Sequence, residues 1–248
     1  MKIIIAPAKK MNIDNDTFEY ETMPQYVEET ALLLKAMKKL SYTEAKQMWN
    51  CSDKLAETNY KWLQGLDLKK QLTPALLAFS GIQYQYMAPD LFTEPALNYV
   101  RNNLRILSGF YGILRPFDGV VPYRLEMQSN LKMPDYHNLY EFWNSKIYNA
   151  LTKNSETIIN LASQEYAKTI TPYLKNNQKL VTIVFASMVN GKLKTKATLA
   201  KMARGEMVRF MAENNATNIA TVKQFKHPNW EFSSEFSTDN QLTFIYHK

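Results

Sequence analysis

The stretch LRILSGFYGILRPFDGVVPYRLEM, residues 104–127, combines glycine, arginine and apolar residues more densely than any other part of this 248-residue chain. It contains three of the seven glycines and three of the six arginines, Arg105, Arg115 and Arg124. Arginine offers a planar fork of hydrogen-bond donors that matches carboxylate or phosphate, whereas lysine is a mobile point charge. The stretch therefore predicts a site built to hold an anion.

The other arginines are Arg101, just upstream, and Arg204 and Arg209 in the segment KMARGEMVRF. All remaining positive charge in the chain comes from lysine. Confinement of arginine to these segments favours an anion site over general solubilisation. The alternative is that the arginines fix buried turns by donating to backbone carbonyls, or to Asp118 or Glu126.

Charge is distributed unevenly along the chain. Residues 1–100 carry 11 lysines against 12 acidic residues, whereas residues 101–248 carry 19 basic residues against 11 acidic ones. Residues 166–205 hold eight basic residues and no acidic residue. Such a field attracts polyanions and raises their rate of encounter. A solvated, lysine-rich surface is the alternative interpretation.

Composition and length restrict the class of protein. Hydrophobic residues make up 46% of the chain and charged residues 21%, which is typical of a folded globular protein. The apolar run at the N-terminus is too short for a secretory signal, and no segment approaches the length of a membrane span. The single Cys51 excludes an internal disulfide framework and fits a reducing compartment. We expect a cytoplasmic protein.

Hydrophobic periodicity predicts one mixed α/β domain over residues 1–248, with a β-sheet surrounded by helices. Strands are expected at Lys2–Ala6, Ala75–Phe79, Thr157–Ala162, Lys179–Phe185 and Gln241–Tyr246, with Lys192–Lys196 completing a hairpin around Asn190 and Gly191. Helices are expected at Pro24–Leu40, Ser41–Trp49, Ser52–Trp62, after the cap residue Thr93, and at Leu139–Leu151 and Thr198–Glu213. Residues 104–108 fit either a helix or a strand.

Residues 41–65 predict two helices joined by a short turn. Ser41 and Glu44 form a capping-box pattern at the start of the first helix, and Ser52 or Asp53 can cap the second. In a helix–hairpin–helix, such a turn aims backbone amides at a DNA phosphate without reading base sequence. Ser52, Asp53 and Lys54 would occupy that turn, although the usual glycine-x-glycine is missing and two packed helices need no function.

Other chemistries have less support. The three histidines are far apart, so we expect no metal site, and the absence of a phosphate-loop or dinucleotide motif predicts no cofactor. Ser163 follows an expected strand and could form a serine–lysine pair with Lys9, as could Ser108. Capping the next helix is the more common role of a serine such as Ser163.

Several blocks together resemble the peroxide stress resistance YaaA family. They are IIIAPAK at the start, SDKLA at 52–56, the stretch 104–127, LYEFW at 139–143, INLASQEY at 159–166 and MARGEMVRF at 202–210. The blocks run in family order along nearly the whole chain. The resemblance implies a cytoplasmic, single-domain protein that limits damage from peroxide by limiting intracellular iron. It also implies a family-specific fold, with a positively charged cleft and a helix–hairpin–helix element that binds duplex DNA.

The sequence departs from the family pattern at a few positions. Ala6 stands where the family has serine, Ser80-Gly81-Ile82 replaces a segment resembling lysine-glycine-aspartate, and Asn229-Trp230 replaces a glycine-tyrosine pair. These departures weaken any catalytic role for positions 6 and 82. The resemblance carries over no established catalytic activity.

The leading hypothesis is therefore a peroxide stress protein that binds duplex DNA in a basic cleft with little base readout. The expected DNA- or anion-binding residues are Lys9, Ser52, Lys54, Arg105, Ser108, Gly109, Gly112, Arg115, Arg124, Lys201, Arg204 and Arg209. The alternative is an enzyme acting on a small anion such as a nucleotide, since Tyr123, Glu126 and Glu165 are chemically richer than DNA binding requires. Direct iron sequestration is disfavoured by the small number of metal-binding side chains.

Overall fold

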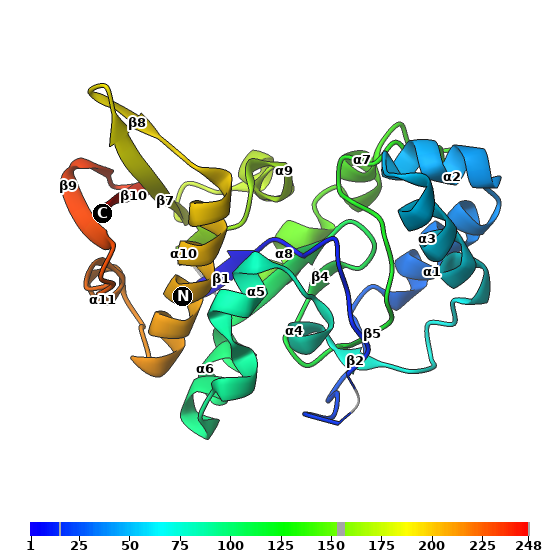
Figure 1. The fold of residues 1–248 in the computed structure, drawn as a ribbon, viewed down its shortest axis with the longest axis horizontal. Coiled ribbons are helices and arrows are strands. Elements are labelled where there is room, and N and C mark those ends of the chain that lie inside the picture. The colour runs from blue at the N-terminus through cyan, green and yellow to red at the C-terminus, as the bar shows by residue number, and fades with distance from the viewer. Residues whose placement is uncertain (15, 153–156, 248) are drawn as a thin grey trace.

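A twisted mixed sheet runs through the middle of the computed structural model, which describes residues 1–14, 16–152 and 157–247 (Figure 1). Within these ranges the sheet has eight strands in the order β4-β3-β1-β6-β7-β10-β9, with β8 paired to β7. The strands are β1 (Lys2–Ile5), β3 (Leu104–Ser108), β4 (Gly112–Leu114), β6 (Thr157–Leu161), β7 (Lys179–Val189), β8 (Lys192–Lys194), β9 (Trp230–Thr238) and β10 (Gln241–Tyr246). A separate two-stranded sheet pairs β2 (Thr73–Pro74) with β5 (Gly119–Val120).

The centre of the sheet is parallel. Strand β1 pairs with β3 on one side and with β6 on the other, so that Ile3 lies beside both Leu104 and Ile159. Ile3, Ile4 and Ile5 have no exposed surface. An uninterrupted apolar run of this kind is typical of a parallel strand covered on both faces.

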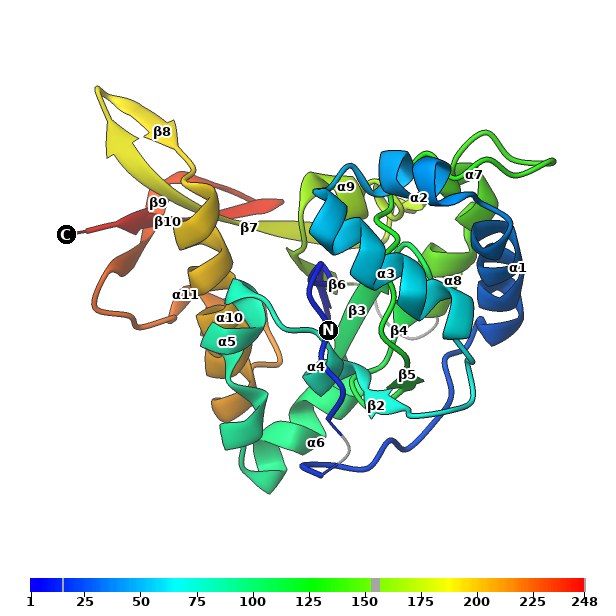
Figure 2. The same ribbon diagram turned by 45° about the vertical axis from the view of Figure 1, so that its right-hand side comes forward.

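Helices flank this sheet on both sides of β1. Figure 2 shows α5 and α10 on one side of the central strands β3 and β6, and α1, α2 and α3 on the other. The α-helices are α1 (Val27–Lys38), α2 (Tyr42–Trp49), α3 (Asp53–Gly65), α4 (Ala75–Ala78), α5 (Ile82–Met87), α6 (Glu94–Asn103), α7 (Leu139–Trp143), α8 (Lys146–Thr152), α9 (Gln164–Ala167), α10 (Ala197–Glu213) and α11 (Ile219–Lys223). Short 3-10 helices lie at Pro89–Leu91 and Thr171–Tyr173. Among the residues described, no helix combines the length and apolar character needed to cross a membrane.

Most predicted elements are confirmed, and residues 104–108 form a strand. The predicted strand at Ala75–Phe79 is wrong, because Ala75–Ala78 forms the short helix α4. A short buried apolar run does not distinguish the two by periodicity alone. The predicted helix at Leu139–Leu151 is two helices, because Asn144 adopts a positive φ of 43° between α7 and α8. Strand β9 was not predicted.

The predicted helix–turn–helix at residues 41–65 is confirmed as two helices, whereas its assignment as a DNA-binding helix–hairpin–helix stays a prediction. The capping box of Ser41 and Glu44 is formed at the start of α2. Asn50 ends α2 in the left-handed region, with a φ of 43°. Ser52 is the N-cap residue of α3, but its side chain makes no capping hydrogen bond.

Helix α10 packs closely against α5 at Gly205. A Cβ atom added to Gly205 would lie 2.1 Å from the carbonyl oxygen of Gln83 and 2.8 Å from the amide nitrogen of Met87. Both contacts are to backbone, which does not move aside as a flexible side chain would. The absence of a side chain at Gly205 therefore fixes how near α10 can approach α5, and with it the position of the neighbouring Arg204.

We expect Gly205→Ala to lower the free energy of unfolding by about 1–3 kcal/mol, because the new methyl group overlaps the backbone of α5. Gly65→Ala is the matched control, since a Cβ at Gly65 would meet no atom within 4 Å. The control should change stability little, or raise it by up to about 1 kcal/mol through helix propensity. Urea denaturation measures both variants, and equal stability of the two would contradict this packing.

Candidate anion-binding site

The direction in which the chain adds strands to the sheet changes between β1 and β6. From β1 the chain continues to its neighbour β3 on one side, whereas β6, β7 and β10 follow on the other side. In open sheets of parallel strands, ligands bind beside the carboxyl ends of the strands at such a switch point. The segments after β1 and β6 are therefore the place to look for a site.

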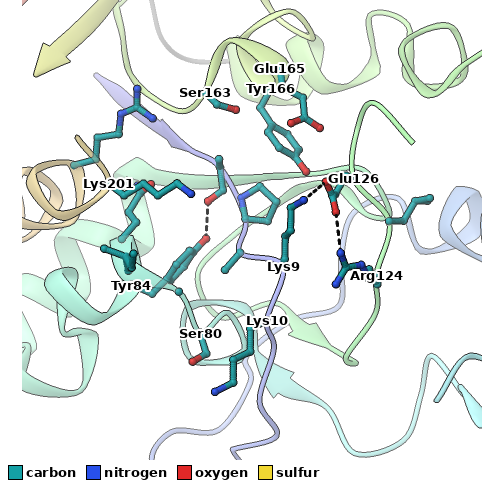
Figure 3. Close-up of a pocket in the computed structure, with 18 of the residues that line it drawn as sticks. Lys9, Lys10, Ser80, Tyr84, Arg124, Glu126, Ser163, Glu165, Tyr166 and Lys201 are labelled. Carbon is teal, nitrogen blue, oxygen red and sulfur yellow. Dashed lines mark hydrogen bonds and ion pairs between the residues drawn. The ribbon is translucent and has the colours of Figure 1, made fainter. Parts of the chain in front are cut away.

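A cavity of about 490 Å³ lies at this place. Its walls come from the loop after β1, the start of α9 after β6, the start of α5, residues 123–126 and α10 (Figure 3). Its lining residues are Ala6, Pro7, Ala8, Lys9, Lys10, Ser80, Gly81, Ile82, Gln83, Tyr84, Tyr123, Arg124, Leu125, Glu126, Ser163, Glu165, Tyr166, Lys201 and Arg204. The volume is in the range of small-molecule and cofactor sites.

One side of the cavity carries a chain of ion pairs. Glu126 accepts from Lys9, with 2.8 Å between Oε2 and Nζ, and its other oxygen lies 3.7 Å from Nη2 of Arg124. The Lys9 side chain is 65% exposed, whereas that of Arg124 is 10% exposed. Figure 3 shows both cations directed at Glu126. This side therefore combines one mobile and one fixed positive charge around a single carboxylate.

The opposite side is formed by α10 and α5. Figure 3 places Lys201 of α10 across the cavity from Arg124 and Glu126. Arg204 lies three residues after Lys201 on the same helix, and burial lowers the pKa of its guanidinium. Gln83 of α5 is only 7% exposed. The close approach at Gly205 brings these two helices together along this wall.

Buried donors without a partner gather at this cavity. In the part of the chain that the structure describes, three buried side-chain nitrogens have no hydrogen-bond partner: Nε2 of Gln83, Nε of Arg124 and Nε of Arg204. All three residues line the cavity. Buried polar groups are normally paired, and leaving one unpaired costs about 1–3 kcal/mol. Their gathering at one cavity makes this cavity the candidate site for a ligand with acceptor atoms.

Glu165 supplies a carboxyl group with altered proton affinity. Burial raises its pKa, and the amide nitrogen of Gln128, 3.1 Å from Oε1, partly offsets that shift. The nearby charge of Glu126 raises the pKa further, whereas Lys9 lowers it. A carboxyl group whose pKa moves toward neutrality can exchange a proton with a bound molecule.

Hydrogen bonds fix the backbone around the cavity. The hydroxyl of Tyr84 donates to the carbonyl oxygen of Ala6 at 3.0 Å, which ties α5 to the loop after β1. Ser108 and Tyr123 share a hydrogen bond of 2.6 Å between their hydroxyl oxygens. A Cβ at Gly109 would lie 2.6 Å from the carbonyl oxygen of Leu125, so only glycine permits this contact behind the wall. The site is thus held by rigid elements.

The turn between α2 and α3 connects directly to this wall. The indole Nε1 of Trp49, the last residue of α2, donates to the carbonyl oxygen of Arg124 at 2.7 Å. Nη2 of Arg124 lies 3.5 Å from the carbonyl oxygen of Trp49 in return. Ser52 and Lys54, which follow in the turn and at the start of α3, are exposed. The predicted DNA-binding turn therefore adjoins the cavity without lining it.

The structure divides the predicted site residues among several places. Lys9, Arg124, Lys201 and Arg204 line the cavity, and Ser108 and Gly109 support its wall from behind. Arg105 and Arg115 line a different cavity. Arg209 pairs with Glu213 on α10 at 2.8 Å. Gly112 lies at the start of β4 against Trp143, with a φ of 72°.

Sequence reasoning did not identify Gln83 or Tyr84 as site residues. Neither belongs to a motif, and both reach the cavity only because α5 packs against α10 and against the loop after β1. Ala6 and Ile82, two positions at which a departure from the family pattern is expected, also line the cavity. Both positions place apolar side chains in this site.

Comparison with known proteins gives consistent matches over the whole chain. A family model described as "Peroxide stress protein YaaA" matches residues 1–236. A UPF0246 protein of Lactiplantibacillus plantarum is 61% identical over 246 residues, with 99% of each chain covered. A UPF0246 protein of Pediococcus pentosaceus is 54% identical, with 99% of this chain and 98% of the relative covered. One of Agathobacter rectalis is 49% identical, with 98% of each covered.

We expect Glu165→Gln to stabilise the protein at neutral pH and to have little effect below pH 4. Because the pKa of Glu165 is raised in the folded state, its ionised form opposes folding above that pKa, and this cost disappears once the carboxyl is protonated in both states. Thermal denaturation of both proteins between pH 3.5 and 8 measures the difference. A Tm difference that does not change with pH would contradict the raised pKa.

Proposed function

This chain belongs to the peroxide stress protein YaaA family, and from that premise we propose that it binds a small anionic molecule in the cavity beside β1 and β6. The observation that carries the proposal is the gathering of three unpaired buried donors, on Gln83, Arg124 and Arg204, at this one cavity. The anionic group of the ligand would supply the missing acceptors. Peroxide resistance, through an effect on the iron available for damage, would follow from that binding.

The two sides of the cavity suit different parts of such a ligand. Arg204 and Gln83, with Lys201 beside them, form the wall that would hold a phosphate or carboxylate, since a guanidinium pairs with such groups through two parallel hydrogen bonds. Arg124, Lys9 and Glu126 form the facing wall. A volume of about 490 Å³ accommodates a molecule of nucleotide size.

The same cavity also has the groups for acid–base chemistry. Glu165 has a raised pKa, and Glu126 is paired with Lys9 at 2.8 Å. Two carboxyl groups in different electrostatic environments can take the roles of proton donor and proton acceptor. We therefore propose that a ligand bound between the two walls exchanges a proton with Glu165, which is the step that an acid–base enzyme would need.

Duplex DNA is the second candidate, and a feature of α3 favours it. Ser52 does not cap α3 with its side chain, and the first residues of the helix are exposed. The first amides of a helix have no partner within the helix and attract phosphate. Exposed Lys192, Lys194 and Lys196 on the β7–β8 hairpin and after it would add contacts to the DNA backbone.

The convergence of titratable groups in a cavity nevertheless favours the small molecule. Arg124 and Arg204, two of the cations expected to line a DNA cleft, are largely buried, whereas phosphates of a duplex lie at its surface. A phosphate of DNA would reach the turn and the exposed lysines more easily than either arginine. The DNA hypothesis therefore depends on a surface adjoining the cavity.

For the small molecule, we expect Arg204→Ala to weaken binding roughly 10- to 100-fold, since a hydrogen bond to a charged group contributes about 1.5–3 kcal/mol. Nucleotides, sugar phosphates and dicarboxylates would be screened by thermal shift and the hits measured by calorimetry. Arg209→Ala is the matched control, because it removes the same charge from the same helix outside the cavity. Failure of every compound to bind, or equal weakening by both variants, would contradict the proposal.

For DNA, we compare Asp53→Pro with Asp53→Ala in fluorescence anisotropy of a labelled duplex across a salt series. Both variants remove the acidic side chain, but only proline removes the first amide of α3, a position at which proline is compatible with a helix. If this helix end binds a phosphate, the proline variant should bind about 3- to 10-fold more weakly than the alanine variant. Equal affinities of the two variants for the duplex would contradict a role of this turn in DNA binding.

A further inference from the structure

A second cationic cavity lies at the opposite end of the central strands. It has a volume of about 330 Å³, and its polar lining residues are Lys2, Gln25, Arg105, Arg115 and Asp118. Lys2 begins β1 and Arg105 is the second residue of β3, so these cations lie at the amino ends of parallel strands. The cavity described above lies beyond the carboxyl end of β1.

The register of the sheet brings Lys2 and Arg105 to one face. Arg105 is directly beside Ile4 in the pairing of β1 with β3. Lys2 precedes Ile4 by two residues, and alternate residues of a strand point to the same face. Two positive side chains on neighbouring strands are therefore held on one face of the sheet, where like charges repel each other.

Hydrogen bonds to backbone hold both cations without neutralising them. Nη1 of Arg105 donates to the carbonyl oxygens of Leu104 at 2.6 Å and Arg101 at 3.3 Å. Lys2 donates from Nζ to the carbonyl oxygen of Asn102. Among the residues described, Nε and Nη2 of Arg105 have no hydrogen-bond partner, so part of the guanidinium fork remains available.

The carboxylate of this cavity, Asp118, is already engaged. It is 1% exposed; Oδ1 accepts from Thr22 at 2.6 Å and from Nε of Arg115 at 3.0 Å, while Oδ2 accepts from the Arg115 amide at 2.8 Å. These bonds close the turn at residues 115–118 and neutralise one arginine. The four charged lining residues, three cations and one carboxylate, therefore leave a formal charge of +2.

The excess charge is reflected in the titration of these side chains. Burial lowers the pKa of both Lys2 and Arg105. The charge of Arg105 lowers the pKa of Lys2 further. The charge of Arg115 lowers the pKa of Arg105, and that of Asp118 partly offsets this shift. Lys2 and Arg105 thus each have a neighbouring cation that disfavours their charged form, and a bound anion would relieve this repulsion.

We propose that Lys2, Arg105 and Arg115 form a second anion site, which takes the phosphate group of a small phosphorylated molecule. A phosphomonoester carries a charge of about −1.5 to −2 at neutral pH, which matches the excess charge of this cavity. A carboxylate, with a single charge, would leave part of the repulsion in place. Arginine forks suit the oxygens of phosphate in particular.

The site differs from the first cavity in the chemistry it allows. There, Glu126 and Glu165 lie among the cations as titratable groups. Here the carboxylate is fixed within its own turn, and every other charge is positive. The second cavity therefore offers cations and no free carboxylate to its ligand, as a site that binds a molecule without transforming it would.

The test is a titration of isotopically labelled protein with inorganic phosphate, observed by two-dimensional amide NMR at constant ionic strength. The expected result is a saturable shift of the amide signals of residues 104–106 and of Arg115, Phe117 and Asp118, with sodium chloride at equal ionic strength giving none. Arg105→Gln should weaken this binding roughly tenfold or more. If Arg105→Gln does not fold, Lys2→Gln is the second variant, and it should also weaken phosphate binding.

Arg204→Ala separates this proposal from the first one, because it alters the cavity beyond the carboxyl end of β1 and should leave the shifts at residues 104–106 unchanged. A response that does not saturate, that chloride reproduces, or that survives both Arg105→Gln and Lys2→Gln would overturn the second site. None of these results depends on whether the first cavity binds a small molecule or on whether α3 binds DNA.

Discussion

Burial of β1 between two parallel neighbours is the constraint on which the rest of the structure depends. The strand is hydrogen-bonded along one edge to β3 and along the other to β6, and its isoleucines have no exposed surface. Burying each such side chain stabilises the fold by about 1.5–3 kcal/mol, which requires helices over both faces of the sheet. The loop after β1 emerges among α5, α9 and α10 and lines the cavity between them.

The interior of this cavity is the part of the molecule least favourable to stability. Two buried arginines and a glutamine leave donor nitrogens unpaired, while Glu165 is held where its ionised form is disfavoured. Proteins commonly break the rules of polar pairing at functional sites and compensate elsewhere. Here the compensation comes from close contacts of α10 with α5, and from the ties between Trp49 and Arg124 and between Tyr84 and Ala6.

Much of the fold could be predicted from sequence, because β1 and β6 are short apolar runs and α10 has clear helical periodicity. The site could be predicted only in part. Arg105, Arg115 and Arg124 are neighbours in sequence, yet β3 and β4 turn the chain so that the first two face one cavity and the third another. Clustering along the chain indicated anion binding but not the number of sites. Gln83 and Tyr84 were not predicted because their positions arise from helix packing at Gly205, which no local pattern records.

The central place of β1 has a consequence for the biosynthesis of the protein. The strand leaves the ribosome before both of its partners, which begin at Leu104 and Thr157. At about 5–20 residues per second, the first partner follows after roughly 5–20 s, and the second later still. Throughout that interval an apolar strand with two open edges is exposed, which makes the nascent chain a natural client for chaperones that shield such segments.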